Sequence, residues 1–329
     1  MDPFKALRVY VGDEGVDARL ENITVDDLSP GEVVIRTAWS GVNYKDALAI
    51  TGTGKILRKS PLVAGIDVAG VVVASEDERF SRDDEVLVTS AGLSETRDGG
   101  YAEYARLPAV EVIPVPEGFS MRDTMALGTA GFTAALAVHR MEQNGQTPAM
   151  GPVAVSGATG GVGSVAIDLL SGRGYEVHAL SSKGDAAGDY LRSLGATEVI
   201  NPRELELGTR PLEKALWGGA VDSLGGDLLS WFTRTSVYGG NVASIGLAAS
   251  HKLETTVMPF ILRGVNLLGI NAVDTPREVR EAVWERLAGD LRPRHLDRIV
   301  TGEIALDGIA ECVQGWIDGS VTGRKLVKL

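Results

Sequence analysis

The stretch Val155-Ser-Gly-Ala-Thr-Gly-Gly-Val-Gly-Ser164 decides how this chain folds. Its first residue closes the apolar run 153–155, and four glycines stand within the seven residues 157–163. An apolar run that ends in glycines and continues with helical spacing is typical of a tight strand-to-helix turn. The stretch therefore predicts the first βα unit of a nucleotide-binding fold.

Two of these glycines have separate physical roles in such a turn. Gly160 lets the backbone come close to a pyrophosphate, and Gly163 lets the helix approach the sheet. The helix starting near Gly161 adds N–H groups and its positive dipole end, which hold an anion without a cationic side chain. Ala158 departs from the usual G-x-G-x-x-G pattern, so a tight turn without a ligand is the alternative interpretation.

The sequence around this turn repeats one pattern between residues 152 and 272: a short apolar run, a turn, and a segment of helical spacing. This alternation predicts an α/β fold, namely a doubly wound sheet of six parallel strands with crossover helices. The expected strands are 153–156, 176–180, 198–200, 220–223, 241–245 and 265–270, and the expected helices include 162–170, 190–194 and 227–235.

The first 120 residues have a different pattern, with apolar and β-branched runs between Gly, Pro and Asp turns. They predict a mostly β domain with strands at 8–11, 32–36, 68–74 and 85–88. After residue 273, a helix is expected from Thr275-Pro276 onward and a last strand at 325–327. So short a tail cannot form its own core, so we expect it to return to the first domain. The predicted domains are 1–122, 123–272 and 273–329.

Composition excludes several classes of protein. The net charge of −12 and the lack of a dense Lys/Arg run argue against nucleic acid, because neutralising phosphates takes clustered cations. A single cysteine, Cys312, and four histidines without ligand spacing exclude a cysteine-based zinc site. The N-terminus has an early acid and no long apolar run, so we expect no secretion signal, no membrane anchor and a cytoplasmic location.

The end of the second strand of the predicted sheet bears on the choice of cofactor. Ser181 lies 21 residues after Gly160, where NAD enzymes place an acid on the ribose. The segment Ser181-Ser182-Lys183 holds no acid there. Two hydroxyls and an ammonium favour a 2′-phosphate, so NADPH is the expected cofactor. Asp185 nearby leaves a solvated turn as the alternative.

The whole chain resembles the medium-chain dehydrogenase/reductase superfamily, with its β-rich first domain, its central Ala158-Thr-Gly-Gly-Val-Gly163 turn and its returning tail. The resemblance implies a GroES-like catalytic domain and a Rossmann domain. In the zinc alcohol dehydrogenases of that superfamily, a cysteine and the histidine of a Gly-His-Glu motif bind the catalytic metal. The similar stretches here are 40–46 and 61–67, with Asn43 and Asp67 in the ligand places. A zinc-free branch similar to quinone reductases is therefore expected.

Four stretches are similar to the acryloyl-CoA reductase family, whose members are often named putative quinone oxidoreductases. The resemblance implies NADPH-dependent reduction of the 2,3-double bond of acryloyl-CoA to propionyl-CoA, usually by a homodimer. The stretches are Asn43-Tyr-Lys-Asp-Ala-Leu-Ala-Ile-Thr-Gly52 with Gly54-Lys-Ile-Leu-Arg58, Gly65-Ile-Asp-Val-Ala-Gly70, Gly128-Thr-Ala-Gly-Phe-Thr-Ala134, and Thr256-Val-Met-Pro-Phe-Ile-Leu-Arg263.

The resemblance also implies roles for single residues. Tyr44 is expected against the nicotinamide and the substrate, with Asp46 beside it in the candidate catalytic set. Asp46 and Asp67 are expected to fix local geometry more than to bind substrate, since ion-pair networks are common at such sites. The expected cofactor contacts are Tyr44, Thr159, Gly160, Gly161 and Val162; Ser181, Ser182, Lys183 and Arg203 at the 2′-phosphate; Leu247 and Ile261 along the cleft; and Arg324 as the superfamily's terminal basic residue.

Reduction of an acryloyl thioester needs a hydride at the β-carbon, stabilisation of the charge that develops on the thioester oxygen, and a proton at the α-carbon. Tyr44 is the candidate proton donor, with water as its competitor and stacking on the nicotinamide as its alternative role. Lys55, Arg58 and Lys59 are candidates for binding the CoA phosphates, or they form an ordinary solvated loop.

Two other functions stay open at the level of the sequence. A general NADPH:quinone or enone oxidoreductase would use the same hydride donor without recognising CoA. A protein that binds NADPH without turnover would carry the same glycine turn, because binding a cofactor and using it are separate properties. The segment 258–262 is expected either in the core or at a boundary between subunits.

Overall fold

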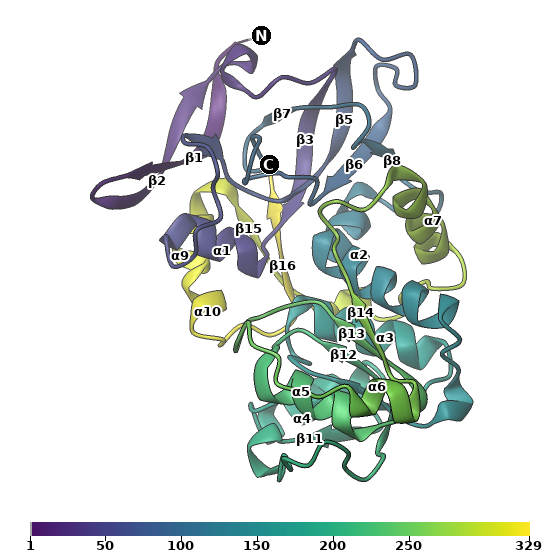
Figure 1. The fold of residues 1–329 in the computed structure, drawn as a ribbon. Helices are drawn as coiled ribbons and strands as arrows, with labels where there is room; N and C mark the ends of the chain where they lie inside the picture. Colours follow the sequence, from purple (N-terminus) through teal and green to yellow (C-terminus); the bar gives the residue numbers. More distant parts are fainter. Residues whose placement is uncertain (1) are drawn as a thin grey trace. The chain divides into compact units, whose positions relative to one another are not determined.

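The structure, a computed structural model, describes residues 2–329. Its contacts divide the chain into two compact units. The first unit runs to Thr129 and takes up Ala272–Ala288 and Val300–Leu329, whereas the second comprises Ala130–Asn271 and Gly289–Ile299. In the ribbon of Figure 1, the purple and blue N-terminal strands therefore share a unit with the yellow C-terminal strands.

The second unit contains the predicted six-stranded parallel sheet, in the order β11-β10-β9-β12-β13-β14. This confirms the fold expected from the alternating pattern. The order reverses beside β9, since β10 and β11 lie on one side of it and β12 on the other, and ligands of such sheets bind at this switch point. The strands are β9 Val153–Val155, β10 Val177–Leu180, β11 Glu198–Ile200, β12 Trp217–Asp222, β13 Ser236–Ser244 and β14 Asn266–Gly269.

Crossover helices connect these strands where the sequence predicts them, and one more precedes the last strand. Their apolar faces pack on the sheet, where Trp217, Trp231 and Phe232 form a buried aromatic cluster with edge-to-face contacts. Burial of three large rings stabilises the unit strongly, because apolar area removed from water is the main driving force of folding. The helices are α3 Gly161–Gly172, α4 Asp185–Ser193, α5 Gly226–Thr235 and α6 Met258–Arg263.

The first unit is built on two sheets, as the turn-rich pattern of its sequence predicts. A seven-stranded sheet has the order β15-β16-β3-β5-β6-β8, with β7 also paired to β3, and a three-stranded sheet has the order β2-β1-β4. The strands are β1 Phe4–Gly12, β2 Gly15–Ile23, β3 Val33–Gly41, β4 Leu62–Val63, β5 Asp67–Ser75, β6 Glu85–Thr89, β7 Tyr104–Leu107, β8 Ile113–Pro114, β15 Val300–Ala305 and β16 Arg324–Lys328.

Two helices of eight or more residues were not foreseen from the sequence: α1, Tyr44–Thr51, and α2, Met121–Gln143. Each begins at a capping box, which is a local start signal for a helix. In α2, Ser120 caps the first turn and accepts from the N–H of Asp123, while Asp123 accepts from the N–H of Ser120. Helix α2 has a sharp kink at Gly128, where φ is 52° and ψ is −156°.

The remaining helices are short or lie in the tail. They are α7 Arg277–Ala288, α8 Leu296–Ile299, α9 Ile309–Cys312 and α10 Gln314–Ile317, with 3-10 turns at Val25–Asp27, Pro148–Met150, Pro202–Glu204 and Leu306–Gly308. Within residues 2–329, no helix combines the length and the apolar character needed to span a bilayer.

The tail is divided between the two units. Most of it joins the first unit, in which β16 pairs with β3, and this is where the whole tail was expected. Residues 289–299 instead belong to the second unit, because the buried carboxylate of Asp168 on α3 accepts from the backbone N–H groups of Arg294 and His295 at 2.8 and 3.0 Å. A buried carboxylate with two backbone donors is a strong local anchor.

Candidate functional site

Tyr44 is the first residue of α1, and two neighbours determine where that helix starts. Asn43 is extended (φ −122°, ψ 160°), and its side chain accepts from the backbone of Asp46. The carboxylate of Asp46 in turn accepts from the N–H of Asn43 at 2.8 Å. This reciprocal cap satisfies helix N–H groups that have no carbonyl one turn earlier. The Tyr44 side chain itself is exposed, at 41%.

Asp46 is completely buried and connects α1 to two other segments. Beyond its contacts with Asn43, it accepts from the N–H of Ile66 at 3.0 Å and from the hydroxyl of Tyr101 at 3.1 Å. Burial, and to a smaller extent the charge of Asp67, raises the pKa of Asp46 to about 7. Asp46 thus braces the start of α1. Its assignment to the catalytic residues stays a prediction, and the complete burial of its side chain does not favour that assignment.

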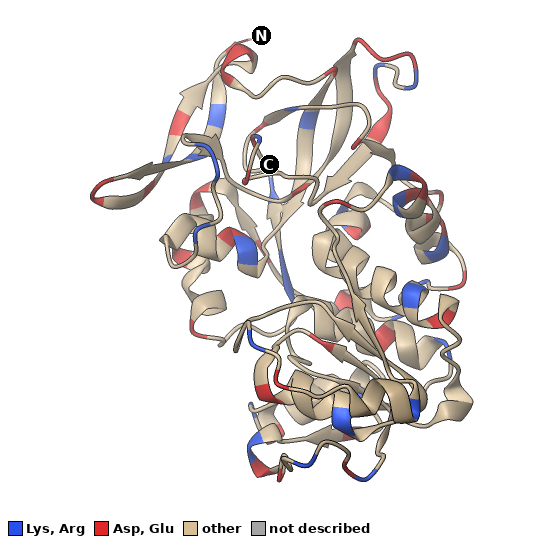
Figure 2. Cartoon of the chain, in the orientation of Figure 1, with Lys and Arg blue, Asp and Glu red and all other residues tan. Residues whose placement is uncertain are grey.

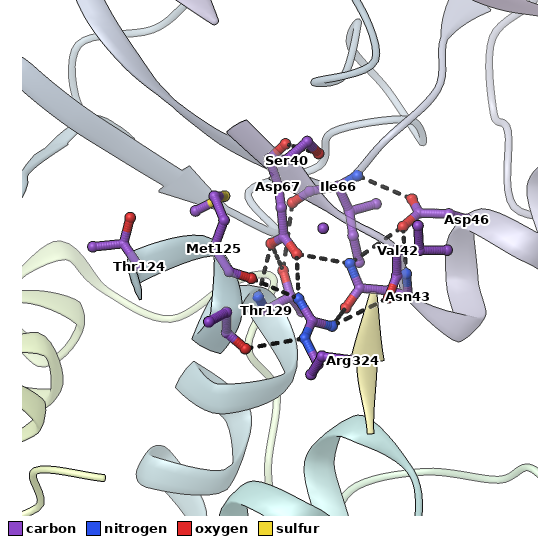
Figure 3. A network of polar contacts seen from close by, with 12 residues as sticks. Ser40, Val42, Asn43, Asp46, Ile66, Asp67, Thr124, Met125, Thr129 and Arg324 are labelled. Carbon is purple, nitrogen blue, oxygen red and sulfur yellow. Dashed lines mark hydrogen bonds and ion pairs between the residues drawn. The ribbon is translucent and has the colours of Figure 1, made fainter. Parts of the chain in front are cut away.

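Asp67, the first residue of β5, forms hydrogen bonds with residues from three distant segments of the chain. One carboxylate oxygen accepts from both the N–H and the hydroxyl of Thr129 at 2.7 Å. The other accepts from the side-chain nitrogen of Asn43 at 2.7 Å and from Arg324 at 3.3 Å. Figure 3 shows the three partners converging on this one side chain.

Arg324, the first residue of β16, has a buried guanidinium that makes five hydrogen bonds. Nε donates to the carbonyl of Ala126, and Nη2 to that of Met125 and to Asp67. Nη1 donates to the carbonyl of Val42 at 3.2 Å and to Oδ1 of Asn43 at 2.6 Å. A guanidinium has five N–H groups, so each of them has a partner within the first unit.

The guanidinium fits there because two glycines leave room for it. A Cβ on Gly41 would lie 2.4 Å from Nη2 of Arg324, and a Cβ on Gly128 would lie 2.4 Å from the same atom and from Asp67. Gly128 also has a positive φ of 52°. We therefore expect side chains at these two positions to be incompatible with the Arg324 network.

Asp67 does not take the place of a zinc ligand, contrary to the expectation from the sequence. When Gly65-Ile66-Asp67 is set against a Gly-His-Glu motif, Ile66 takes the place of the histidine and Asp67 that of the glutamate. Asp67 is therefore not in a ligand place, and Ile66 has no atom that binds a metal. Over residues 2–329, no three His, Cys, Asp or Glu side chains gather in a group that could hold a metal ion.

The glycine turn of the second unit has the geometry that the sequence predicts. Gly160 is the N-cap of α3, and a Cβ there would meet only the carbonyl of Gly157, at 3.3 Å. A Cβ on Gly163 would lie 2.5 Å from that carbonyl, so only glycine permits this close packing. The first N–H groups of α3 have no helical carbonyl to bind, which suits the residues 159–162 to a pyrophosphate.

The residues predicted for the 2′-phosphate lie along the same edge of the sheet. Ser181 follows β10 directly, and its N–H donates to the carbonyl of Ile200 at the end of β11. The hydroxyl of Ser181 accepts from the N–H of Lys183 at 3.2 Å, and Ser182 is exposed. Arg203 is exposed in the 3-10 turn after β11. The structure therefore brings these residues to the carboxyl edge, beside the glycine turn.

Leu247 and Ile261 do not lie together. Leu247 is exposed just after β13, where the preceding residues Ile245 and Gly246 bind the carbonyl of Asp222 at the carboxyl edge. Ile261 is on α6, which the chain reaches only after running along the length of α5. Arg263 at the end of this helix binds the carbonyl of Ser236, the first residue of β13, so the exposed Ile261 side chain is near the amino edge of the sheet. A cofactor contact of Ile261 within its own chain stays a prediction without support from this geometry.

Hydrogen bonds to α5 fix the path of the segment that leads from β13 to α6. It passes α5 from start to end, through the pairs Gly226 with Lys252, Ser230 with Glu254 and Thr233 with Thr255. Arg263 at the end of α6 then donates to the carbonyl of Ser236, the first residue of β13. Helix α6 therefore lies at the opposite edge from the glycine turn.

Sequence reasoning missed several residues at these two sites. Ser156 donates to Asp222 at 2.6 Å across β9 and β12, the switch point of the sheet. In the first unit, Tyr101 binds both Asp46 and the carbonyl of Gly41, and burial raises its pKa well above the ordinary value. Ser156 directly follows the apolar strand β9 and Asp222 is the last residue of β12, and polar residues at such strand ends were the available signal. No local pattern indicated Tyr101.

Comparison with known proteins gives matches in both units. Residues 29–117 match the family model of the alcohol dehydrogenase GroES-like domain, and residues 161–289 match that of the zinc-binding dehydrogenases. Over 99% of both chains, the protein is 46% identical to the putative quinone oxidoreductase YhfP of Bacillus subtilis. It is 44% identical, again over 99% of both chains, to the probable acrylyl-CoA reductase AcuI of Escherichia coli.

Solved structures agree with these matches. The yhdH oxidoreductase of Salmonella enterica in complex with NADP is 44% identical, with a TM-score of 0.95 over 99% of both chains. The Bacillus subtilis protein yhfP with NAD bound is 45% identical, with a TM-score of 0.96 over 100% of both chains. The fold of the whole chain is therefore shared with oxidoreductases that were solved with a nicotinamide dinucleotide.

Proposed function

Since this chain belongs to the medium-chain dehydrogenase/reductase superfamily, in its family of acrylyl-CoA reductases and putative quinone oxidoreductases, we propose that it reduces the 2,3-double bond of acryloyl-CoA with NADPH. The observation that carries this proposal is the similarity to an acrylyl-CoA reductase along nearly the entire chain. Helix α1 adds support, because it presents an exposed Tyr44 on a rigid, capped base.

The overall reaction is acryloyl-CoA + NADPH + H⁺ giving propionyl-CoA + NADP⁺. NADPH supplies the hydride, which forms the new C–H bond at the β-carbon as the C=C π-bond breaks. The displaced electron pair is delocalised onto the thioester oxygen until a proton binds the α-carbon. The tasks left for the protein are to hold the thioester, to stabilise the negative oxygen and to deliver the proton.

NADPH is proposed over NADH on the basis of the carboxyl edge of the second unit. The hydroxyl groups at 181 and 182, the ammonium of Lys183 and the exposed guanidinium of Arg203 would surround a 2′-phosphate there. The residues 159–162 at the start of α3 would hold the pyrophosphate. One relative was solved with NADP and another with NAD, and kcat/KM measured with NADPH and with NADH tests the preference of this chain.

A general quinone or enone oxidoreductase is the second candidate, favoured by the equally full-length similarity to YhfP. The experiment that separates the two is stopped-flow measurement of NADPH oxidation with acryloyl-CoA, crotonyl-CoA and a simple quinone. A kcat/KM for acryloyl-CoA that exceeds the others supports the proposal. Preference for the quinone supports the second candidate, and tight NADPH binding without oxidation by any of the three contradicts both.

Tyr44→Phe is expected to lower kcat with acryloyl-CoA by about 10- to 100-fold, because it removes the candidate proton donor while water takes over part of the role. The phenyl ring keeps the stacking surface, so KM for NADPH should change little. The measurement is kcat in H₂O and D₂O. If both kcat and the solvent isotope effect equal those of the wild type, Tyr44 is not the donor and its role is stacking alone.

CoA recognition is proposed for the loop that follows α1. Lys55, Arg58 and Lys59 are exposed, and the N–H of Arg58 donates to the carbonyl of Glu95 at 2.7 Å, which ties the loop down. Elsewhere, basic and acidic residues are intermixed along both units (Figure 2). A local group of cations is useful here because the protein carries a net charge of −12, which repels an anionic substrate.

Arg58→Glu is expected to raise KM for acryloyl-CoA by about 10-fold and to leave KM for methyl vinyl ketone unchanged, because only the CoA ester carries phosphates. The matched control is Arg82→Glu, which makes the same charge change at an exposed position on the β5–β6 turn. Equal effects on both substrates, or an equal effect of the control, would remove the loop from CoA binding.

A second copy of this chain is the proposed partner. Strand β14 is at the edge of its sheet, and edge strands have unpaired N–H and C=O groups that another chain can bind. Helix α6 next to it exposes Ile261 and Leu262 at 72% and 57%. Exposed apolar side chains beside an open edge are typical of a surface that associates with a copy of itself.

A further inference from the structure

We propose that Glu95 is a positioning residue that acts through its ion pair with Lys45 and fixes the first turn of α1, the turn that presents Tyr44. The inference rests on the proposed function, since Tyr44 has a task in catalysis only if the chain is a reductase. Neither Lys45 nor Glu95 is among the site residues predicted from the sequence, and both belong to the first unit.

The first argument is that the three opening residues of α1 point in three directions, because consecutive residues of a helix are about 100° apart around its axis. Tyr44 is exposed at 41%, whereas Asp46 is buried and accepts from the N–H of Ile66 (Figure 3). Lys45, between them, makes an ion pair with Glu95. Lys45 and Asp46 thus anchor the first turn on two sides. Since residues one position apart do not face each other, Lys45 acts on the helix and not on the Tyr44 ring.

The second argument is the charge of Lys45. It is the second residue of α1, where the helix dipole is positive and a cation is unfavourable. The carboxylate of Glu95 offsets this repulsion. The pair is only partly exposed, with 31% of the Lys45 side chain and 15% of the Glu95 side chain open to solvent. Water and salt screen such a pair less than an ordinary surface ion pair, so it holds the helix more firmly.

The third argument is the constrained backbone of the segment before Glu95. Ser90, Ala91 and Ser94 have positive φ values of 61°, 47° and 60°, which residues with a Cβ seldom adopt. One carbonyl within the segment accepts from the N–H groups of residues 95–97, which keeps it closed. Strained backbone of this kind persists only where the surrounding structure holds it, and it clusters at functional sites. The segment therefore presents the carboxylate of Glu95 from a fixed base.

Glu95 also contacts the loop proposed for CoA binding. Its backbone carbonyl accepts from the N–H of Arg58 at 2.7 Å, while its carboxylate binds Lys45. One residue thus joins the helix that presents Tyr44 to the loop whose cations would bind the CoA phosphates. Because the contact with Arg58 is made by the backbone, a change of the Glu95 side chain removes the contact with α1 alone.

The test compares Glu95→Gln and Lys45→Met with the wild type in the full chain. Each variant removes the ion pair and nearly keeps the side-chain volume. We expect kcat with acryloyl-CoA to fall by about 10-fold, part of the roughly 100-fold that a displacement of about 1 Å costs at a reacting group. KM for NADPH should stay within about twofold, since no cofactor contact is lost. The double variant should be no slower than either single variant, because the two side chains act as one unit.

The matched control is Glu111→Gln. It breaks the ion pair of Glu111 with Arg97, which follows the same constrained segment, and 24% of the Glu111 side chain is exposed. Neither residue of this pair is on α1, so kcat should equal that of the wild type. The reversed pair, Lys45→Glu with Glu95→Lys, restores the attraction and places an acid where the helix dipole favours it. It should recover kcat to within about threefold of the wild type.

A second readout is independent of turnover. Hydrogen exchange of the amides of α1 should be faster in Glu95→Gln and in Lys45→Met, because the first turn of this helix loses one of its two anchors. Exchange should have the wild-type rate in Glu111→Gln and return close to that rate in the reversed pair. If one of the single variants does not fold, the other carries the same comparison.

Three results would overturn the inference. The first is an unchanged kcat or an unchanged α1 exchange rate in the single variants, or a control that changes either of them equally. The second is a loss of about 100-fold in the double variant, since additive effects mean that the two side chains act separately. The third is a reversed pair with wild-type exchange that stays slow, which would place the Lys45 ammonium on the substrate. If the wild type turns over no activated alkene, the proposed function fails, and the exchange rates still decide whether Glu95 holds α1.

Discussion

Gly128→Ala is expected to lower the free energy of unfolding by about 4 kcal/mol, the sum of a strained backbone and an overpacked core site. At φ 52° and ψ −156°, the backbone of Gly128 is in a region that residues with a Cβ rarely adopt. The new methyl group would also lie 2.4 Å from Arg324 and from Asp67, both fully buried. Urea denaturation followed by fluorescence measures the loss.

Gly319→Ala is the matched control for this substitution. Gly319 is in the same unit and has a φ of 73°, yet a Cβ there would meet nothing within 4 Å. We expect it to cost about 1 kcal/mol, the price of the left-handed backbone alone. Equal losses for the two variants would show that the Arg324 network yields to the methyl group and that close packing around Gly128 does not stabilise the fold.

Ser181→Asp is expected to lower the ratio of kcat/KM for NADPH to that for NADH by about 100-fold, because two like charges a few ångströms apart repel by several kcal/mol at a partly screened site. The new carboxylate can still accept from the N–H of Lys183, as the Ser181 hydroxyl does at 3.2 Å. It can also accept from the 2′-hydroxyl of NADH, so activity with NADH should persist or rise.

The control for Ser181→Asp is Thr147→Asp, which adds the same charge at an exposed residue before the 3-10 turn that precedes β9. Thr147 is therefore on the amino side of the sheet, and aspartate is a favourable residue at such a cap. The cofactor ratio of this variant should match the wild type. Should Ser181→Asp leave the ratio unchanged, or should the wild type prefer NADH, the 2′-phosphate site at the end of β10 would be refuted.

The parallel sheet of the second unit was predictable because its signals are local. An apolar run, a glycine turn and a helical spacing occupy adjacent positions in the chain, and each depends only on neighbouring residues. The structure has strands at all six expected places. The helices α1 and α2 were missed although their capping boxes are equally local.

The candidate site in the first unit was predictable only in its parts. Tyr44, Asp46, Asp67 and Arg324 could be singled out by resemblance, one motif at a time. Their partners could not, because a hydrogen bond between Arg324 and Asn43 joins residues 281 positions apart. Such a contact depends on β16 pairing with β3, and the apolar pattern of a strand indicates which of its faces is buried but not which distant segment it pairs with.

By itself, the sequence determined the nucleotide-binding turn, the class of each unit and the expected edge for the cofactor, since glycine freedom and apolar spacing act over a few residues. Only the tertiary structure decided that Asp46 is a buried brace, that Ile261 lies away from the glycine turn and that every N–H of Arg324 has a partner. The physical reason is that burial and hydrogen-bond pairing are properties of segments brought together by folding, and a side chain of given chemistry can bind a ligand only with the donors that its neighbours leave unpaired.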